Sequence, residues 1–287
     1  MLYNLSMSII GNKSAVRTPE FHKKKVREQR IKIALLILGA IVLVAVPIYL
    51  LVTPKFVITN IHLVGNNVTK SEDIQRIVVD DMSGNILWFF PRSNVALYPK
   101  KKIELDLLRA IPRLASADLS LTDAHSLTVT VAEREPVALY CKDVSHPNAP
   151  TGCYFLDDQG FIFSEAPSFS DGVYHVFSSD PVIDAPLSTT YLPPATFAPL
   201  NPFIKSLNDA GLYPKVFVSK DGEDDLILSN GGKIMLKSDA DFDLAKSNLT
   251  SLISDPSFLK GGHGLNDLLY IDLRFGNKIF YKFTDNS

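Results

Sequence analysis

The residue types that most often do chemistry are present in this 287-residue sequence, but they form no recognised catalytic pattern. No two of its six histidines have the spacing of metal ligands on one element. They are His22, His62, His125, His146, His175 and His263. The chain lacks the Gly-x-Ser-x-Gly pattern of a serine nucleophile and the glycine-rich loop that binds phosphates. We therefore expect a protein without enzymatic activity, metal, cofactor or small-molecule substrate.

One acidic run has some of the residue types of a calcium loop. Asp239, Asp241 and Asp243 alternate as the first ligands of such a loop do. The sixth position, where a calcium loop has glycine, is Leu244, and the twelfth, where it has glutamate, is Thr250. We interpret the run as the solvated start of a helix and not as a metal site.

The two cysteines, Cys141 and Cys153, belong to neighbouring segments with strand character. A disulfide between them would close the intervening hairpin and would contribute ~3 kcal/mol if the geometry allows it. Two buried free thiols are the alternative, because disulfides persist only in oxidising compartments. The sequence leaves both states open, and nothing in it fixes a histidine beside either thiol.

The last apolar segment, residues 278–283, has the pattern of a strand that binds a partner through its main chain. It is a candidate edge strand, to which a partner strand is added. Lys278 and Lys282 would lie on one side of it, where they limit self-pairing or attract an acidic partner. The alternative is that the strand only completes its sheet. The predicted partner-binding residues are Arg274, Phe275, Lys278, Ile279, Phe280, Tyr281, Lys282 and Phe283.

A charge-free apolar segment at residues 33–53 is the element that would position the rest of the chain. As a helix it would extend about 31 Å, enough to cross a hydrocarbon layer of ~30 Å. A cleaved signal peptide has a shorter apolar region and a small-residue cleavage site, and a core helix has a polar stripe. The segment has none of these features, which predicts one transmembrane helix.

The charges are distributed unevenly around this segment. Residues 1–32 hold eight Lys or Arg and two Glu, a net charge of +6, so the remainder carries −8 within the overall −2. Cations collect on the cytoplasmic side of membrane helices, which predicts a cytoplasmic basic tail at 1–32 and folded domains outside the cytoplasm. The acidic folded part lacks the excess of cations that nucleic acid binding needs.

Residues 55–138 have the pattern of a first folded unit, a three-stranded sheet with two helices. Apolar spacing predicts strands at 58–64, 119–121 and 127–131 and helices from Ser71 and over 101–110. Helices on one face of the sheet would bury both apolar sets. Residues 88–99, between the helices, are unusually apolar. They would cover a sheet edge or helix ends, form a ligand site, or enter the membrane interface, which aromatic rings favour.

Residues 139–287 have the pattern of a mostly antiparallel β-domain with two helices. Strands are predicted at 137–141, 153–156, 161–163, 173–177, 216–218, 226–228, 233–236, 268–273 and 278–283. Helices are predicted from 201 and over 239–254. Residues 164–200 carry little periodic signal and are expected to be mainly loop. The fold class is therefore α+β.

Four segments of the first unit resemble the POTRA domain of the FtsQ/DivIB family of bacterial cell-division proteins. They are residues 61–66, 84–87, 107–112 and 127–138. The most specific is the last, in which Glu-Arg-Glu-Pro-Val-Ala follows an alternating strand. In the second unit, residues 232–236 and 270–274 resemble the family's strand-then-helix unit and its closing signature.

The resemblance implies a non-enzymatic scaffold of the division machinery in the bacterial cell membrane. Such a scaffold would bind single-pass partners of the FtsB/FtsL type at the septum and help to control septal peptidoglycan synthesis. The alternative is a POTRA-type chaperone or secretion component that handles envelope polypeptides. Proteins of that class usually carry several POTRA units or a terminal β-barrel, and the sequence shows neither.

Overall fold

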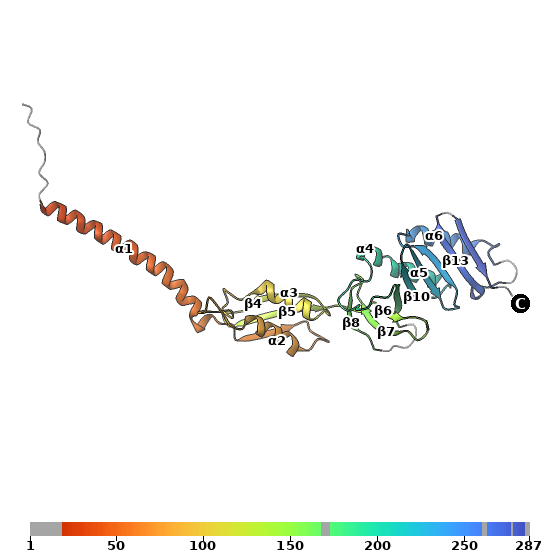
Figure 1. Cartoon of the computed structure of the whole chain (residues 1–287), viewed down its shortest axis with the longest axis horizontal. Coiled ribbons are helices and arrows are strands. Elements are labelled where there is room, and N and C mark those ends of the chain that lie inside the picture. The colour runs from red at the N-terminus through yellow and green to blue at the C-terminus, as the bar shows by residue number, and fades with distance from the viewer. Residues whose placement is uncertain (1–18, 168–172, 260–262, 277, 285–287) are drawn as a thin grey trace, which may run out of the picture. The chain divides into compact units, whose positions relative to one another are not determined.

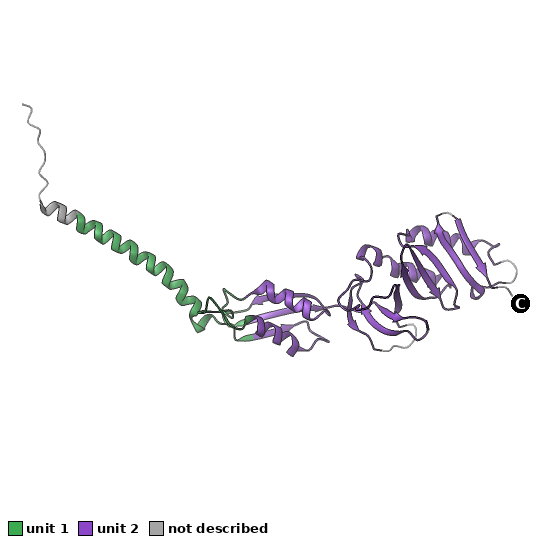
Figure 2. Cartoon of the chain, viewed as in Figure 1, with its two compact units in different colours: residues 1–60, 82–98, 122–126 green, residues 61–81, 99–121, 127–287 purple. Residues whose placement is uncertain are grey.

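The computed structural model describes residues 19–167, 173–259, 263–276 and 278–284 (Figure 1). It is an α+β structure with one apolar N-terminal helix and a large sheet-rich C-terminal part, as predicted. The chain divides into two compact units (Figure 2). The first contains the N-terminal helix with residues 82–98 and 122–126, and the second contains residues 61–81, 99–121 and 127–287.

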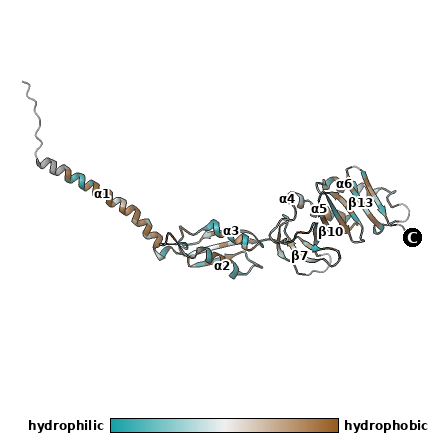
Figure 3. Cartoon of the chain, in the orientation of Figure 1, coloured by the Kyte–Doolittle hydropathy of each residue, from teal (hydrophilic) through white to brown (hydrophobic). Residues whose placement is uncertain are grey.

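Helix α1 spans Pro19–Val52 and is about 51 Å long at ~1.5 Å per residue. It begins before the predicted segment, because part of the basic stretch continues the same helix. Its part from Val26 to Val52 is long and apolar enough to cross a membrane, and none of it is buried within the chain. Figure 3 shows the hydrophobic stretch of this helix following a hydrophilic one. The helix is therefore longer than predicted, and it contains an apolar stretch sufficient in length and composition for the predicted membrane span.

In the compact unit that contains α1, a short hairpin lies against the end of this helix. Its strands are β2 (Asn85–Ile86) and β3 (Phe90–Pro91), and β3 contacts α1. The chain that leaves α1 joins the same group, because the Val95 N–H donates to the Phe56 carbonyl at 2.9 Å. The sequence pattern does not predict this hairpin, since strands of two residues are too short to show alternation.

A three-stranded sheet in the order β1–β5–β4 follows. Its strands are β1 (Asn60–Val64), β4 (Leu114–Leu121) and β5 (Ser126–Glu133), and its helices are α2 (Ser71–Met82) and α3 (Lys100–Ala110). Strands β4 and β5 form the predicted antiparallel hairpin, with Ala117 opposite Val131. The order of strand, two helices and two strands agrees with the prediction, apart from the inserted β2–β3 hairpin.

Apolar side chains at helical and strand spacing hold this small layer together. Those with no exposed surface are Ile74, Val78, Ile103, Leu107, Leu119, Leu127 and Val129. Along β5 the intervening Thr128 and Thr130 are more exposed, as expected for a strand with one buried face. Burial of such side chains contributes ~1.5–3 kcal/mol each before the entropy cost of folding.

The loop after β1 depends on two residues with different roles. Gly65 has φ +94°, and a Cβ atom there would lie 2.0 Å from the Val131 carbonyl oxygen, so only glycine fits. The Glu133 carboxylate accepts the main-chain N–H groups of residues 67–69 at 2.8–3.0 Å. Burial acts to raise the pKa of Glu133, but these N–H groups outweigh it and lower that pKa.

The larger sheet has nine strands in the order β14–β13–β12–β11–β10–β9–β6–β7–β8. They are β6 (Ala138–Asp143), β7 (Thr151–Leu156), β8 (Ile162–Glu165), β9 (His175–Asp180), β10 (Pro214–Lys220), β11 (Glu223–Leu228), β12 (Lys233–Lys237), β13 (Leu268–Phe275) and β14 (Lys278–Phe283). Five neighbouring pairs are antiparallel. Three are parallel, namely β6 with β9, β9 with β10 and β12 with β13. The sheet is therefore mostly antiparallel, as predicted, with helical crossovers at two of its parallel pairs.

The described residues of this part of the chain form three α-helices, where the sequence predicted two helices. They are α4 (Pro194–Phe197), α5 (Leu200–Asp209) and α6 (Phe242–Ser254). The additional helix is α4, a single turn that is too short for a periodic signal. Helix α6 begins at Phe242 because the Asp241 carboxylate caps it, accepting the N–H groups of Asp243 and Leu244 at 3.0 and 3.1 Å. This agrees with the interpretation of the acidic run as a helix start.

Helices α5 and α6 bury their apolar residues in the core on one face of the nine-stranded sheet. Phe203 and Leu207 of α5 and Leu249 of α6 belong to this core. The Phe177 ring is fully buried in this core, 5.2 Å from the Phe197 ring and 5.7 Å from that of Phe217.

The other face carries a smaller apolar cluster that includes Cys141. Cys141 and Cys153 are directly opposite each other on β6 and β7 and are joined by a disulfide. The sequence left open a disulfide or two free thiols, and the structure has the disulfide.

Candidate partner-binding edge

Strand β14 is the outermost strand of the nine-stranded sheet and pairs on one side with β13. Its bounds agree with the predicted strand at residues 278–283. Phe275 lies opposite Lys278 near the turn, and Leu268 lies opposite Phe283 at the other end. Within the described ranges, no strand or loop forms main-chain hydrogen bonds with the outer side of β14. We call this outer side the β14 edge.

The opposite edge of the same sheet, at β8, is covered. The Ile162 N–H donates to the Thr189 carbonyl at 2.8 Å, and the Ser188 N–H donates to the Ile162 carbonyl at 2.8 Å. The covering segment is held by Tyr191, whose buried hydroxyl donates to the Ser178 carbonyl at 2.6 Å. Residues 164–200 are expected to be mainly loop with one strand at 173–177, and that strand is β9. The region also contains α4 and a segment that protects a sheet edge, neither of which the sequence predicted.

The pairing with β13 shows which main-chain groups of β14 point outward. The Thr284 N–H donates to the Asp267 carbonyl at 2.8 Å and so points toward β13. Main-chain N–H groups alternate in direction along a regular strand. Both irregularities in the pairing add residues to β13 and not to β14, so the alternation along β14 is not interrupted. The N–H groups of Ile279, Tyr281 and Phe283 therefore point away from β13, toward the open edge.

The side chains of these same residues anchor β14 to the helix-covered face. Ile279 and Phe283 pack against the main apolar core. The buried Phe258 ring lies 4.8 Å from the Tyr281 ring and 5.3 Å from the Phe283 ring. His263 stacks on Phe283 with ring centroids 4.9 Å apart. Strand β14 is therefore fixed in place, while no other described residue pairs with its outer main chain.

The other face of β14 carries exposed aromatic and basic side chains. Phe280 is 51% exposed and Phe275 is 56% exposed, and their rings meet edge to face at 5.4 Å. Lys278 and Lys282 are exposed on the same strand. An aromatic pair flanked by two cations suits a partner strand that alternates apolar and acidic side chains.

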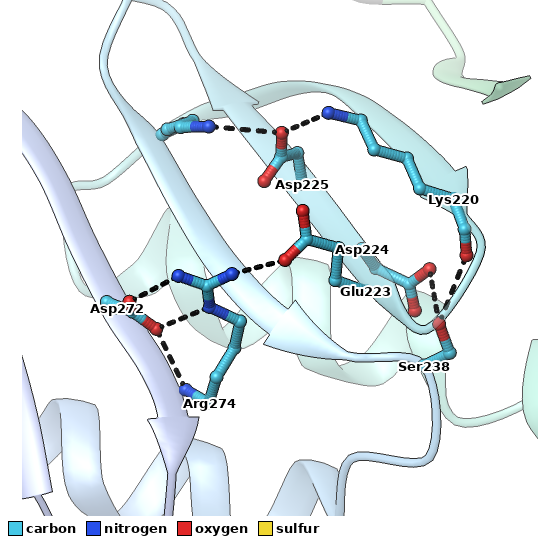
Figure 4. Close-up of polar contacts among 8 residues, drawn as sticks. Lys220, Glu223, Asp224, Asp225, Ser238, Asp272 and Arg274 are labelled. Carbon is cyan, nitrogen blue, oxygen red and sulfur yellow. Dashed lines mark hydrogen bonds and ion pairs between the residues drawn. The ribbon is translucent and has the colours of Figure 1, made fainter.

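Arg274 is engaged within the chain (Figure 4). Its Nε and Nη2 atoms donate to the two Asp272 carboxylate oxygens at 2.9 and 2.7 Å, and its Nη1 atom pairs with Glu223. This guanidinium lowers the pKa of Asp272 and has its own pKa raised by the same bonds. Arg274 is one of the predicted partner-binding residues, and in the structure its side chain joins β13 to β11.

A second group of charges, which the sequence reasoning missed, lies beside this one (Figure 4). The buried Asp225 carboxylate accepts from Lys220 at 2.7 Å and from Lys233 at 3.3 Å. The bond to Asp225 raises the pKa of Lys220. These residues come from three neighbouring strands, so only the sheet order brings them together.

The Glu-Arg motif after β5 also has a structural role. Arg134 donates its Nε to the Pro112 carbonyl at 3.1 Å and pairs with the buried Asp157 carboxylate. Its guanidinium lies 4.3 Å from the centroid of the Phe161 ring. Asp157 in turn accepts the Gln159 and Phe161 N–H groups at 2.9 Å each. The motif therefore ties the end of β5 to the turn before β8.

In the part of the chain that the structure describes, no group of three or more His, Cys, Asp or Glu residues is placed to hold a metal ion. Neither a scan against models of protein families nor a search of curated proteins found a match for this sequence. The geometry of the β14 edge therefore carries the functional argument.

Proposed function

We propose that this protein is a non-enzymatic, membrane-anchored scaffold of the FtsQ/DivIB type in bacterial cell division. In this proposal α1 spans the cell membrane with its basic N-terminal side in the cytoplasm. The three-stranded unit is a POTRA domain, and the nine-stranded sheet is the domain that binds partners. The site of action is the division septum, where the scaffold helps to control septal peptidoglycan synthesis.

The observation that carries the proposal is the difference between the two edges of one sheet. The β8 edge is covered by the chain's own residues 186–190, whereas the β14 edge is uncovered among the described residues. Folded proteins usually protect sheet edges, because an open edge pairs with other chains. An open edge that is firmly anchored by Tyr281 and Phe283 is therefore suited to receiving a specific strand.

The chemistry of the edge specifies the partner strand. Main-chain bonds to Ile279, Tyr281 and Phe283 would supply affinity that does not depend on sequence. Lys278 and Lys282 would favour acidic residues, and Phe280 would favour an apolar residue placed between them. We infer that the partner is an extended segment of a single-pass division protein of the FtsB/FtsL type.

A proline substitution tests strand addition directly. Ile279→Pro removes an outward N–H group and leaves the inward ladder to β13 intact, which edge strands tolerate. Ile279→Ala is the matched control, because it trims the same side chain and keeps the N–H. We expect the proline variant to lose capture of an FtsB/FtsL-like partner and the alanine variant to retain it. Thermal unfolding of both variants would verify that they fold.

Equal capture by the two folded variants would show that β14 does not add a partner strand. The wider role is tested by depletion of the protein with microscopy. Filamentous cells would support a division function. Defects of the envelope without filamentation would instead favour a POTRA-type chaperone or secretion component.

A further inference from the structure

The tip of the β2–β3 hairpin exposes three consecutive large apolar residues. Leu87 is 74% exposed, Trp88 is 90% exposed and Phe89 is 74% exposed. Single apolar residues are common on protein surfaces, but an aromatic group of this size at one loop tip marks a binding surface. The expectation that these residues cover a sheet edge or helix ends is therefore wrong for the tip itself.

The backbone of the tip is strained in order to present these side chains. Leu87 has φ +48° and Trp88 has φ +72°, so both lie in the left-handed region. Glycine and asparagine are the usual residues there, because a bulky side chain costs roughly 1–2 kcal/mol per residue in that conformation. Two large apolar residues at such positions indicate that their side chains serve a purpose outside the fold.

The same hairpin is fixed to the end of helix α1. Asn94, which is 1% exposed, donates its side-chain N–H to the Leu51 carbonyl at 3.0 Å and thereby caps the last turn of the helix. The Asn94 Oδ1 atom accepts the Ala96 N–H at 2.9 Å, so both ends of the amide are bonded. Strand β3 contacts α1, and both elements belong to one compact unit.

This attachment limits how far the tip lies from a membrane that α1 crosses. Trp88 is two residues from Phe90 in β3, and an extended chain covers at most ~3.4 Å per residue, or about 7 Å. The polar layer on each side of the hydrocarbon core is about 5–8 Å thick. The tip is therefore held close to the end of α1, where that layer would lie in the proposed span, and the layer is also the zone that tryptophan side chains prefer.

We propose that Leu87, Trp88 and Phe89 insert into the interfacial layer of the bilayer and form a second membrane contact beside α1. The proposal rests on the membrane anchoring proposed above. The apolar rings would lie against the upper acyl chains, and the indole N–H would donate to lipid ester or phosphate oxygens. Together with the Asn94 cap, this contact would fix the first folded segment at the membrane surface.

The chain contains one tryptophan, so its fluorescence reports on the tip without any substitution. The full-length protein would be reconstituted in vesicles of phosphatidylcholine and phosphatidylglycerol, and flotation would verify that it is membrane-bound. We expect blue-shifted Trp88 emission, protection from aqueous iodide and loss of emission when brominated lipids replace the normal ones. The control is Leu87→Ser with Phe89→Ser, which keeps Trp88 and α1 and should reduce the quenching by brominated lipid while flotation is unchanged.

Three outcomes would overturn the proposal, and they differ in what they imply. Floating protein with red-shifted, iodide-accessible emission would place the tip in water. Protection from iodide without quenching by brominated lipid would show that another protein surface, such as a second copy, covers the tip. Loss of flotation would refute the anchoring itself, and this proposal with it.

Discussion

The Arg274 guanidinium and the Asp272 carboxylate form a two-point ion pair on β13, with nitrogen to oxygen distances of 2.9 and 2.7 Å. Asp272 is only 6% exposed, so its charge depends on this partner. Arg274 reaches on to Glu223, which lies 51 residues away in the sequence. The pair therefore joins β13, the neighbour of β14, to β11 within the sheet.

Arg274→Met is expected to lower the free energy of unfolding by about 2 kcal/mol, because it removes both side-chain donors of the buried Asp272 carboxylate and leaves only the main-chain N–H of residue 274 at 3.1 Å. Partial exposure of Arg274 keeps the effect below that of a fully buried pair. Urea unfolding of the variant, of Asp272→Asn and of the double variant gives the coupling energy. Additive losses would show that the two side chains act independently.

Glu133 should make the stability of the first sheet dependent on pH. The pKa of Glu133 is lowered in the folded state. The stabilisation by ionised Glu133 is therefore fully present at pH values above its unfolded-state pKa of about 4.3, and it is lost as the pH falls through the lower folded-state pKa. Glu133→Gln should therefore cost about 1 kcal/mol at pH 7 and progressively less below about pH 4. Denaturant unfolding at both pH values measures this, and a deficit that does not change with pH would contradict it.

The disulfide between Cys141 and Cys153 should stabilise the β6–β7 hairpin. The two residues are 12 apart, and closing a loop of that size stabilises a fold by ~3 kcal/mol through the unfolded chain. The variant with both cysteines replaced by alanine should unfold like the reduced wild-type protein and earlier than the oxidised one. Mass spectrometry after alkylation without a reductant should find neither thiol modified. Alkylated Cys141 in the folded protein would exclude the bond.

Several elements follow from local sequence alone. A charge-free apolar run was sufficient to predict α1, and a short segment rich in aromatic residues was sufficient for β14, whose predicted bounds agree with the structure. The helix start near Asp241 was indicated by its acidic residues. Each of these elements can be predicted because its residue types reflect the burial or exposure of a few neighbouring positions, which the sequence shows directly.

The functional surfaces depend on contacts between distant segments, which local spacing does not encode. The residue types of 278–283 predicted β14 but not whether another segment would cover it, as residues 186–190 cover β8. The Lys220–Asp225–Lys233 group needs the order of β10, β11 and β12. The exposure of Trp88 and the bond from Asn94 to Leu51 follow from a hairpin too short to show any period. The sequence by itself therefore determined most of the helices and strands, but not the short elements β2, β3 and α4. Only the tertiary structure decided which edges and side chains stay open, because that depends on the pairing and packing of the whole chain.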